Sequence, residues 1–370
     1  MVASEMTVKA FLMHQIAALS GRYDVTLIVN TKQSDFAEQN GLPIKVIPLA
    51  IERAIHPVAD IRALYNLFRL FRRNRFDLVH SVTPKAGLLA MMAGKMAGVR
   101  FRVHTFTGQV WAIGHGLSRM LLKAMDRLLA ASATNLLADS FSQRQFLIDQ
   151  EITRPDKLSV LADGSISGVD SGKFRPDNEA RSSIRKQMEI AEDDILFLFL
   201  GRLKRDKGIL DMASAYVDIA AELSNIHMLL VGPDEDCLKE KMNQIAGIYA
   251  RRLHFVDYTD VPERYMAAAD VFCLPSYREG FGNVIIEAAA CGLSAIGSRI
   301  YGITDAIIDG KTGLLFPAGD VPALAFAIKR MAIDHVLRKE MGEQAQRRAI
   351  RDFPSERVTQ AWLEYYDALL

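Results

Sequence analysis

Two glutamates in the second half of the chain carry the clearest chemical signal. Glu279 and Glu287 lie in the stretch Leu274–Gly292 (LPSYREGFGNVIIEAAACG). The largely apolar run Asp270–Leu274 predicts a buried strand before the loop, and the residues from Val284 onward favour a helix after it. Ligands of open α/β sheets bind at such junctions, where the start of the helix favours an anion. The two carboxylates can accept hydrogen bonds from vicinal hydroxyls, as on a sugar or a ribose.

Spacing leaves three interpretations of this pair open. As ligand-binding groups, Glu279 in the loop would lie nearer the reactive end and Glu287, in the helix, would lie deeper. As ordinary residues they would be a surface glutamate and a helix glutamate, which spacing alone favours, whereas the flanking glycines favour function. The third interpretation is the acid and nucleophile of a glycosidase, which depends on a carboxylate separation that a sequence does not give.

A basic loop follows another predicted strand. Gly201–Gly208 (GRLKRDKG) comes directly after the apolar run Ile195–Leu200 and contains two arginines and two lysines. Bidentate arginine contacts and lysine point charges could hold a diphosphate there. The order of a Walker A loop, GxxxxGK[ST], is missing. Taken alone, the loop fits a solvated basic turn equally well.

The first half has weaker candidates at the ends of its predicted strands. Ser81–Gly87 (SVTPKAG) and His104–Gln109 (HTFTGQ) both follow strands and are expected to face a cleft between domains. Lys85, near a helix start, could meet a phosphate or be an exposed helix lysine. His104 falls inside a strand, which favours a core residue over a catalyst. Asp139-Ser140 ends another strand and is ambiguous.

Two basic amphipathic helices are predicted at Arg62–Phe76 and Leu117–Leu129. Apolar residues on one side and Arg or Lys on the other suit an anionic lipid interface. The alternative is a surface helix whose apolar face lies in the core. The two interpretations weigh evenly for the first helix, and the core is favoured for the second.

The elements that must position these residues alternate strand and helix in both halves, which predicts two α/β domains with parallel, doubly wound sheets. The Gly, Ser and Asp-rich stretch Leu161–Asp177 marks the join, so we expect domains at 1–177 and 178–352. Residues 353–370 contain a final amphipathic helix. The first strand is anomalous, because only Met1–Ser4 precede the helix predicted at Val8–Leu19. Either that strand is very short or a few native N-terminal residues are missing.

Composition narrows the class of protein. The chain has 370 residues, 50% of them hydrophobic and 24% charged, as in soluble globular proteins of two domains. The net charge of +1 divides into +6 over residues 1–170 (20 basic, 14 acidic) and −5 over 171–370 (25 basic, 30 acidic), which suggests different partners for the two halves. The offset is too small to indicate nucleic-acid binding.

Targeting signals and cysteines point to the cytosol or to the cytosolic membrane surface. The cysteines, Cys237, Cys273 and Cys291, lack metal-ligand spacing and fit a reducing compartment. The N-terminus lacks the apolar run of a signal peptide. The longest uncharged run, Val103–Ser118, is too polar to span a bilayer.

In this order and spacing, the motifs together resemble the retaining glycosyltransferases of family four, whose architecture is called GT-B. The E-x7-E motif of that family corresponds to Glu279–Glu287 and its basic glycine loop to Gly201–Gly208. Gly164–Asp170, followed by Phe174, resembles the interdomain loop, and Gly310–Leu315 resembles the downstream DGxxGxL element. The stretches TPKAG and HTFTGQVW are most similar to bacterial members that build O-antigen, capsule or exopolysaccharide units on a polyprenyl diphosphate.

The resemblance implies two Rossmann-like domains facing each other across a cleft, with 353–370 returning to the first. The first domain would bind the acceptor and the second the nucleotide sugar. Arg202 and Lys207 would hold the diphosphate and stabilise the leaving nucleotide. Glu279 would bind donor-sugar hydroxyls and Glu287 the ribose. The other residues implied are Gly280, Phe281 and Gly282 through their backbone, Asn283, and Tyr258 near the base on the donor side, with Lys85 and Thr107 on the acceptor side.

Two departures from the family pattern concern the first domain. Members often carry a histidine in a TxHG segment near the reacting sugar, and here Thr107 takes its place in Thr105–Gly108. His104 lies three positions earlier and does not inherit that role. The glycine-rich loop after the first strand is also missing, since Ser4–Val8 contains no glycine.

The resulting prediction is a retaining, metal-independent glycosyltransferase with no bound cofactor, in which Glu279, Arg202 and Lys207 are the catalytic residues. It would move a hexose or N-acetylhexosamine from UDP to a polyprenyl-diphosphate-linked saccharide, at the inner face of the cytoplasmic membrane. Such a protein would serve capsule or lipopolysaccharide assembly. The rival predictions are a nucleotide-sugar epimerase of the same architecture and a non-catalytic subunit of a polysaccharide assembly complex.

Overall fold

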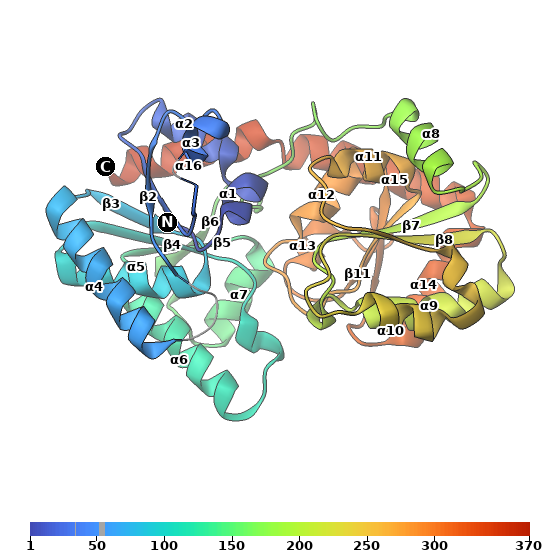
Figure 1. The fold of residues 1–370 in the computed structure, drawn as a ribbon, viewed down its shortest axis with the longest axis horizontal. Coiled ribbons are helices and arrows are strands. Elements are labelled where there is room, and N and C mark those ends of the chain that lie inside the picture. Colours follow the sequence, from blue (N-terminus) through green and yellow to red (C-terminus); the bar gives the residue numbers. More distant parts are fainter. Residues whose placement is uncertain (34, 52–55) are drawn as a thin grey trace. The chain divides into compact units, whose positions relative to one another are not determined.

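The structure is a computed structural model that describes residues 1–33, 35–51 and 56–370 (Figure 1). The chain forms two compact units. The first comprises Met1–Gly168 together with Ser355–Leu370, and the second comprises Val169–Pro354. The break after Gly168 falls inside the Gly, Ser and Asp-rich stretch, nine residues before the expected boundary at 177.

The first unit is built on parallel strands flanked by helices (Figure 1). Four strands pair in the order β3-β4-β5-β6, and β1 and β2 form a separate parallel pair. The strands are β1 (Thr26–Val29), β2 (Lys45–Pro48), β3 (Leu78–Ser81), β4 (Phe101–Phe106), β5 (Asn135–Ala138) and β6 (Leu158–Val160). The helices are α1 (Glu5–Phe11), α2 (Met13–Ser20), α3 (Phe36–Gln39), α4 (Pro57–Asn74), α5 (Pro84–Ala97), α6 (Gly116–Ser132) and α7 (Phe141–Asp149). The helix predicted at Val8–Leu19 is thus two helices that meet at Leu12.

The last helix, α16 (Ser355–Leu369), packs on α2 and belongs to the first unit, as expected. Its Trp362 ring stacks on His80 of β3, with centroids 4.8 Å apart. The Tyr366 hydroxyl lies 2.7 Å from Nδ1 of His80, while Nε2 of the same ring lies 2.8 Å from Oγ1 of Thr105. Burial lowers the pKa of His80 well below its usual value, so a neutral imidazole fixes α16 to the sheet.

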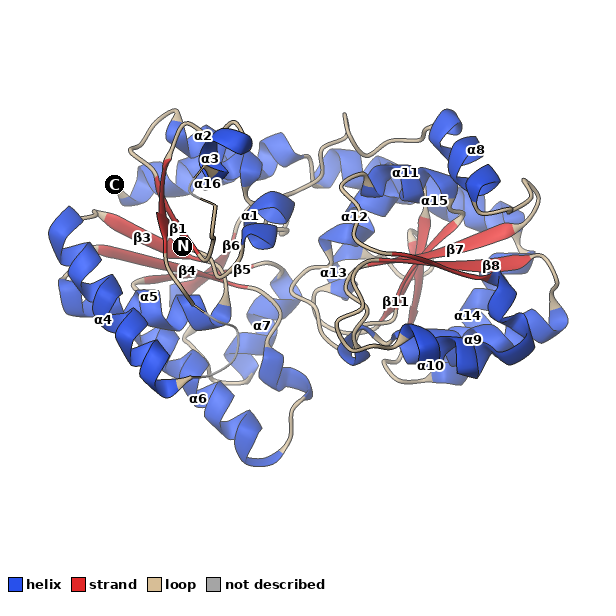
Figure 2. Ribbon diagram, viewed as in Figure 1, coloured by secondary structure: helices blue, strands red, loops and turns tan. Residues whose placement is uncertain are grey.

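The second unit has a six-stranded parallel sheet in the order β12-β11-β10-β7-β8-β9, with helices on both faces (Figure 2). Its strands are β7 (Ile195–Leu200), β8 (Ile226–Val231), β9 (Leu253–Val256), β10 (Val271–Leu274), β11 (Ser294–Ser298) and β12 (Gly313–Phe316). Every residue of β8, β10 and β11 is buried, which explains the continuous apolar runs read from the sequence. The helices are α8 (Asn178–Gln187), α9 (Ile209–Glu222), α10 (Lys239–Ala246), α11 (Pro262–Ala268), α12 (Asn283–Ala290), α13 (Ile303–Ala306), α14 (Val321–Ile333) and α15 (His335–Asp352).

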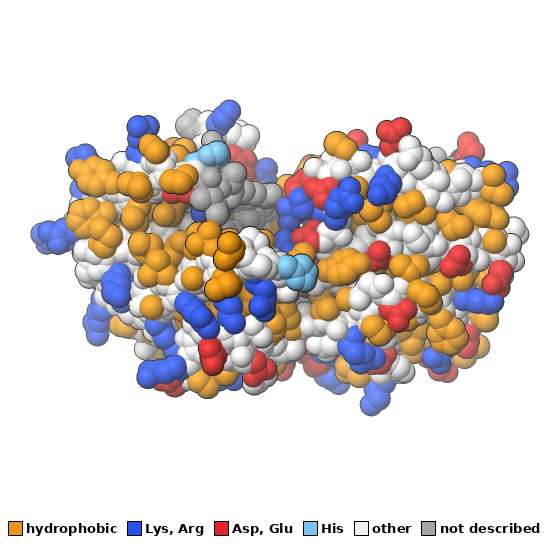
Figure 3. All heavy atoms as spheres, turned by 90° about the horizontal axis from the view of Figure 1, so that it is seen from below, with side chains coloured by type: hydrophobic (Ala, Val, Ile, Leu, Met, Phe, Trp, Pro, Cys, Tyr) orange, Lys and Arg blue, Asp and Glu red, His pale blue; other side chains and the backbone are white. Residues whose placement is uncertain are grey.

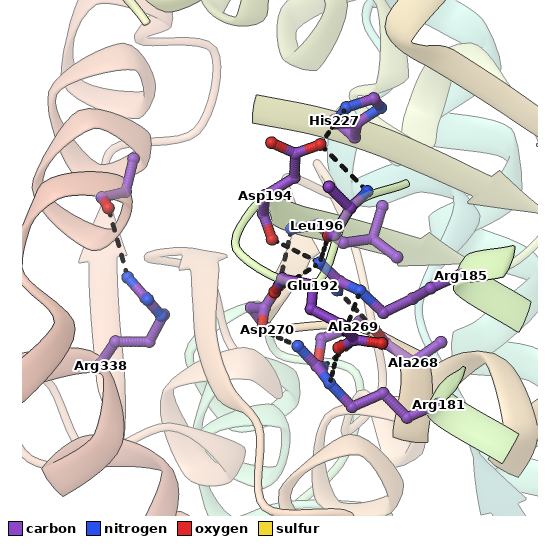
Figure 4. Close-up of polar contacts among 12 residues, drawn as sticks. Arg181, Arg185, Glu192, Asp194, Leu196, His227, Ala268, Ala269, Asp270 and Arg338 are labelled. Carbon is purple, nitrogen blue, oxygen red and sulfur yellow. Dashed lines mark hydrogen bonds and ion pairs between the residues drawn. The ribbon is translucent and has the colours of Figure 1, made fainter. Parts of the chain in front are cut away.

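A charged cluster clamps α8 to the amino ends of β7 and β10 (Figure 4). The fully buried Arg185 donates to Oδ2 of Asp270 at 3.2 Å and to the carbonyl of Ala268 at 3.1 Å. Arg181 pairs with Oδ1 of Asp270 at 3.0 Å, and the amide of Leu196 donates to Oδ2 at 2.7 Å. Because these charges are satisfied within the fold at the amino ends of the strands, they serve to anchor the helix. The polar loops of interest lie at the other ends of β7 and β10.

Candidate functional site

The two loops singled out in the sequence meet at the carboxyl ends of β7 and β10, which are neighbours in the sheet. Gly201–Gly208 follows β7 and 275–282 follow β10. Gly208 has φ +68°, and a Cβ built there would lie 2.0 Å from the carbonyl oxygen of Pro275. The amide of Tyr277 donates to the carbonyl of Asp206 at 2.9 Å. Only glycine permits this approach, so the backbones of the two loops lock together.

The close contact between the two loops brings Lys207 next to Glu279. Nζ of Lys207 lies 2.5 Å from Oε1 of Glu279, and Oγ of the buried Ser276 donates to the same oxygen at 2.8 Å. The two charged side chains are only 17% and 15% exposed. A lysine ammonium has three donors, so its bond to Glu279 leaves capacity for an anionic ligand. Two of the predicted site residues therefore form one partly buried ion pair.

A second layer of contacts holds the loops from behind. Nη2 of Arg278 lies 2.7 Å from Oδ2 of Asp206, and the hydroxyl of Tyr277 donates to Oδ2 of Asp211 at 2.5 Å. That hydrogen bond, with burial, raises the pKa of Tyr277 to about 12. Sequence reasoning passed over Tyr277, Arg278, Asp206 and Asp211. The sequence did contain a signal for two of them, because the carboxylates Asp206 and Asp211 lie within and just after the basic loop.

Arg202 lies with a different carboxylate. Its Nη1 is 3.0 Å from Oε2 of Glu235, in the loop after β8. Lys204 lies 3.1 Å from Oδ1 of Asp236, and the amide of Arg205 donates to the other oxygen of that carboxylate at 3.0 Å. The hydrogen bond from the amide of Arg205, together with the one from Lys204, lowers the pKa of Asp236. Glu235 and Asp236, also passed over, form an acidic partner for half of the basic loop, so a diphosphate would have to compete with Glu235 for Arg202.

The start of α12 is shaped by glycines. Gly282, with φ +78°, is the N-cap, and Asn283 is the first residue of the helix and is buried. The side chain of Phe281 is 2% exposed and packs edge-on against Phe353, with centroids 5.2 Å apart. A Cβ on Gly302 would come within 2.5 Å of the Gly280 carbonyl oxygen. The side chain of Phe281 therefore belongs to the core, and only its backbone is available to a ligand.

Glu287 has a separate environment from Glu279. It is half-buried on α12, and burial raises its pKa to about 7, an effect that the nearby charge of Lys173 opposes. Tyr258, placed beyond the end of β9, is 56% exposed and donates its hydroxyl to Oδ1 of Asp260 at 2.8 Å.

The first-unit candidates lie at the carboxyl end of that unit's own sheet. Nζ of Lys85, at the start of α5, lies 2.6 Å from Oδ1 of Asp60 on α4, and its side chain is 14% exposed. The exposed-lysine interpretation is therefore wrong. The Thr107 carbonyl accepts from Nε2 of Gln109 at 2.7 Å and from Nε2 of Gln143 at 2.8 Å.

Two further polar residues at this edge are buried. His104 is 1% exposed and bonded through Nδ1 to Oγ of Ser81 at 2.8 Å; burial lowers its pKa to about 3, which confirms a core histidine. Burial raises the pKa of Asp139 to about 8, and Oε1 of Gln143 accepts from its amide. Sequence reasoning noted Asp139 and the stretch that ends at Gln109 but missed Gln143, which donates to Oε1 of Gln109 at 3.3 Å and so joins the two.

Two α/β units, each with a parallel sheet and polar loops at its carboxyl ends, define the GT-B class of fold. The comparison with solved structures confirms it. Anabaena Alr3699/HepE, in complex with UDP and glucose, aligns with TM-score 0.82 at 18% identity, covering 99% of this chain and 98% of that one. WaaG, a glycosyltransferase of lipopolysaccharide biosynthesis, aligns with TM-score 0.75 at 16% identity, covering 97% and 95%.

The family follows from two matches that divide the chain as the units do. Residues 180–348 match the family described as glycosyl transferases group 1, and residues 7–164 match the glycosyl transferase 4-like domain. The chain belongs to the group 1 glycosyltransferases, as the resemblance in sequence predicted. This membership argues against the glycosidase interpretation of the two glutamates.

Two relatives illustrate the family. The capsular polysaccharide biosynthesis glycosyltransferase CapM of Staphylococcus aureus is 26% identical over 346 residues, which is 93% of this chain and 90% of CapM. The UDP-Gal:alpha-D-GlcNAc-diphosphoundecaprenol alpha-1,3-galactosyltransferase of Escherichia coli is 28% identical over 290 residues, 77% of this chain and 74% of that enzyme.

Neither a membrane span nor a metal cluster is found in the part of the chain that the structure describes. None of its helices is long and apolar enough to cross a bilayer. No group of three or more His, Cys, Asp or Glu side chains is placed to hold a metal ion.

Proposed function

We propose that the protein is a retaining, metal-independent glycosyltransferase that moves a sugar from UDP to a polyprenyl-diphosphate-linked saccharide. The observation that carries the proposal is the Lys207–Glu279 pair, held by two interlocked loops at the carboxyl ends of β7 and β10. It places a cation for a diphosphate beside a carboxylate for sugar hydroxyls. The E. coli relative, which is named for a UDP-Gal donor and a GlcNAc-diphosphoundecaprenol acceptor, supports the same donor and acceptor classes.

The second unit would bind the donor. A diphosphate would take bonds from Lys207 and draw Arg202 away from Glu235, while the sugar hydroxyls donate to Glu279. The backbone around Gly280–Gly282 and Asn283 at the start of α12 would face the sugar and phosphate. Glu287 would accept from the ribose, and Tyr258 would lie near the base.

The chemistry follows from where charge develops. The bond between the anomeric carbon and the phosphate oxygen breaks as an acceptor hydroxyl attacks the same face, and the leaving phosphate oxygen accepts the proton. Negative charge therefore grows on the diphosphate, where cations already in place stabilise it without reorganising. The resemblance to retaining enzymes implies retention of the anomeric configuration, and since the side chains assigned here include no nucleophile that could form a covalent intermediate, we expect front-face displacement.

The first unit would bind the acceptor. Its net charge is positive, which suits a diphosphate-linked substrate, and the polar edge around Lys85, Thr107 and Asp139 is the proposed acceptor side.

The deciding experiment incubates the protein with a panel of nucleotide sugars and polyprenyl-diphosphate-linked GlcNAc, and reads the anomeric configuration of the product by NMR. A product of inverted configuration contradicts retention. Isomerisation of a donor in the absence of acceptor identifies the epimerase instead. Binding of no nucleotide sugar by calorimetry favours the non-catalytic subunit.

We expect the affinity for UDP to depend on the ionisation of Glu287. Ribose hydroxyls donate to a carboxylate, and burial raises the pKa of Glu287 to about 7. Protons therefore compete with the nucleotide, and affinity should rise with pH up to about 7, falling by about tenfold per unit below it. The folding stability of the free protein has the opposite pH dependence. A carboxyl whose pKa is raised by folding binds a proton more tightly in the folded state, so the free protein loses stability as pH rises through 4.5 to about 7.

Calorimetry of UDP binding between pH 6 and 8 measures this dependence, with Glu287→Gln as the matched control. The phosphate of UDP titrates in the same range, so the ratio of wild-type to variant affinity isolates the carboxyl group. Parallel pH profiles for the two proteins would remove Glu287 from the ribose site.

We also propose that the first unit rests on anionic lipid through α6. Contrary to the preference drawn from sequence, most of the apolar side chains of α6 are not in the core, since its buried residues are Leu129, Ala130 and Ser132. Leu117, Met120 and Leu121 are 83%, 68% and 59% exposed. Arg119, Lys123 and Arg127 lie on the same helix, and Figure 3 shows hydrophobic and basic side chains side by side on the first unit. By contrast, α4 buries Ala63, Leu67 and Phe71 in the core and leaves Val58 and Ile61 exposed.

Replacing Leu117, Met120 and Leu121 together by Ser is expected to lower partitioning onto phosphatidylglycerol vesicles by at least about tenfold, because each side chain forfeits about 1 kcal/mol or more of apolar transfer. Co-sedimentation measures the partitioning. The control is Phe326→Ser, which removes a 69% exposed apolar side chain from α14 of the second unit. Equal loss in both variants, or none in either, would contradict lipid docking through α6.

A further inference from the structure

The loop after β8 is held by its backbone against the basic loop after β7. The amide of Leu203 donates to the carbonyl of Pro233 at 2.9 Å, and Leu203 forms a parallel bridge with Asp234. A Cβ built on Gly232 would lie 2.0 Å from the carbonyl oxygen of Gly201, so the two backbones are in contact. Because β7 lies between β10 and β8 in the sheet, the basic loop is fixed on both sides.

The loop after β8 carries three consecutive acidic residues with different contacts. Both oxygens of Asp234 accept from amides at the start of α10, at 2.8 and 3.0 Å. Asp236 accepts from the amide of Arg205 at 3.0 Å, so these two carboxylates hold backbone in place. Glu235, between them, carries its Oε2 to within 3.0 Å of Nη1 of Arg202. The fixed backbone therefore presents the Glu235 carboxylate to a cation of the proposed donor site.

This carboxylate occupies the same cation that the diphosphate is expected to bind. A guanidinium uses the same N–H donors for a carboxylate and for a phosphate. The side chains of Arg202 and Glu235 are 31% and 29% exposed, so an incoming anion can reach the pair. In the neighbouring pair, the donor is expected to use both Lys207 and Glu279, whereas Glu235 has no assigned contact with it. Donor binding must therefore exchange one anion for another on Arg202.

The exchange leaves Glu235 with a positive partner. Nζ of Lys204 lies 3.5 Å from the same oxygen of Glu235 that Arg202 contacts. When Arg202 turns to the diphosphate, the carboxylate keeps this second cation and its charge is not left unpaired. Because the backbones of the two loops are in contact, only the side chain of Arg202 has to move, and rotamer changes of exposed side chains are fast.

We propose, on the basis of the donor site proposed above, that Glu235 is a positioning residue that holds Arg202 in place of the diphosphate and takes it back when the nucleoside diphosphate leaves. Glu235 keeps the guanidinium at the site between turnovers, and it also competes with UDP for that group. A partly exposed ion pair shifts such an equilibrium by up to about fivefold. Differences in affinity within one site appear mostly in the dissociation rate, so Glu235 shortens the residence time of UDP.

The test replaces Glu235 by Gln in the full chain, which keeps the shape of the side chain and removes its charge. We expect Glu235→Gln to bind UDP about threefold to fivefold more tightly by calorimetry and to release it more slowly by a similar factor in stopped-flow measurements. The matched control is Glu222→Gln, which makes the same change of charge at the last residue of α9, where Glu222 pairs with Lys329. This control should bind UDP as the wild type does.

The same substitution in an Arg202→Ala background distinguishes exchange on Arg202 from a general effect of charge. With no guanidinium to compete for, Glu235→Gln should no longer change the affinity for UDP. An equal gain in both backgrounds would overturn the proposal, because it would show only that removing a negative charge favours an anionic ligand. Unchanged affinity of Glu235→Gln in the wild-type background would overturn it as well.

Inorganic diphosphate, used as a second probe, separates this proposal from the proposed function. If UDP binds and Glu235→Gln affects neither probe, the exchange on Arg202 fails and the donor site stands. If Glu235→Gln binds diphosphate more tightly, but UDP binds no better than diphosphate does, the exchange stands and the nucleotide site fails. Binding of neither probe to any of the proteins would overturn both.

Discussion

Replacing Glu279 by Gln is expected to lower the rate of sugar transfer by about 10²–10³, the loss typical of removing one well-placed charge-stabilising group. Gln keeps the shape and one acceptor for Ser276 but removes the charge that faces Lys207 and the donor sugar. Truncation of Glu279 to Ala would abolish transfer. It would also leave the partly buried Lys207 without its carboxylate partner, which lowers stability. Steady-state transfer measured beside thermal unfolding separates the two effects.

Ser276→Ala is the matched control, because it removes the other bond to the same oxygen without changing charge. We expect it to cost less than tenfold. Wild-type transfer by Glu279→Gln would refute the site.

The two cationic residues of the same site, Lys207 and Arg202, can be tested by measuring the affinity for UDP. Lys207→Met and Arg202→Ala should each weaken UDP binding by at least tenfold, or about 1.4 kcal/mol. Lys204→Ala, which loses contacts with Asp236 and Glu235 but is not assigned to the donor, should bind UDP nearly as wild type does. Unchanged affinity in the Lys207 and Arg202 variants would move the phosphate site elsewhere.

Gly208→Ala is expected to be the most damaging single-methyl change at the site. Gly208 combines φ +68° with a Cβ position 2.0 Å from the Pro275 carbonyl oxygen. The left-handed conformation alone costs about 1–2 kcal/mol for an L-residue. Relieving the overlap requires the β7 and β10 loops to separate, so we expect a total above about 3 kcal/mol and loss of UDP binding, because Lys207 would leave Glu279.

Gly310→Ala isolates the steric part of this effect. Gly310 has φ +73° in the same unit, but no atom lies within 4 Å of its Cβ position. Gly310→Ala should therefore lose only the stability that the left-handed conformation costs an alanine, and it should retain UDP binding. Chemical denaturation and calorimetry of both variants make the comparison, and equal destabilisation would show that the contact with Pro275 is not sterically tight.

Strand-loop-helix junctions were predictable because their signals are local. The apolar run before Gly201, the glycines at Gly208 and Gly282, and the small residues of α12 each act within a few positions. These signals predicted β7, β10 and the two loops after them, and the order of motifs predicted the GT-B fold, which the comparison confirms. The anomaly before Val8 was also visible in the sequence, and the structure has only an isolated bridge there, between Val2 and Val29.

The pairing of side chains was decided only by the tertiary structure. Lys207 and Glu279 are 72 positions apart and meet because β10 lies next to β7, an order set by crossover connections that no local pattern encodes. The same holds for Arg202 with Glu235 and for Lys85 with Asp60. Periodicity likewise predicted that α6 is amphipathic, but which apolar side chains are exposed depends on the surface that α5 offers it. Sequence by itself determined the residue types and the junctions that hold them, whereas the sheet order determined which charge each one faces.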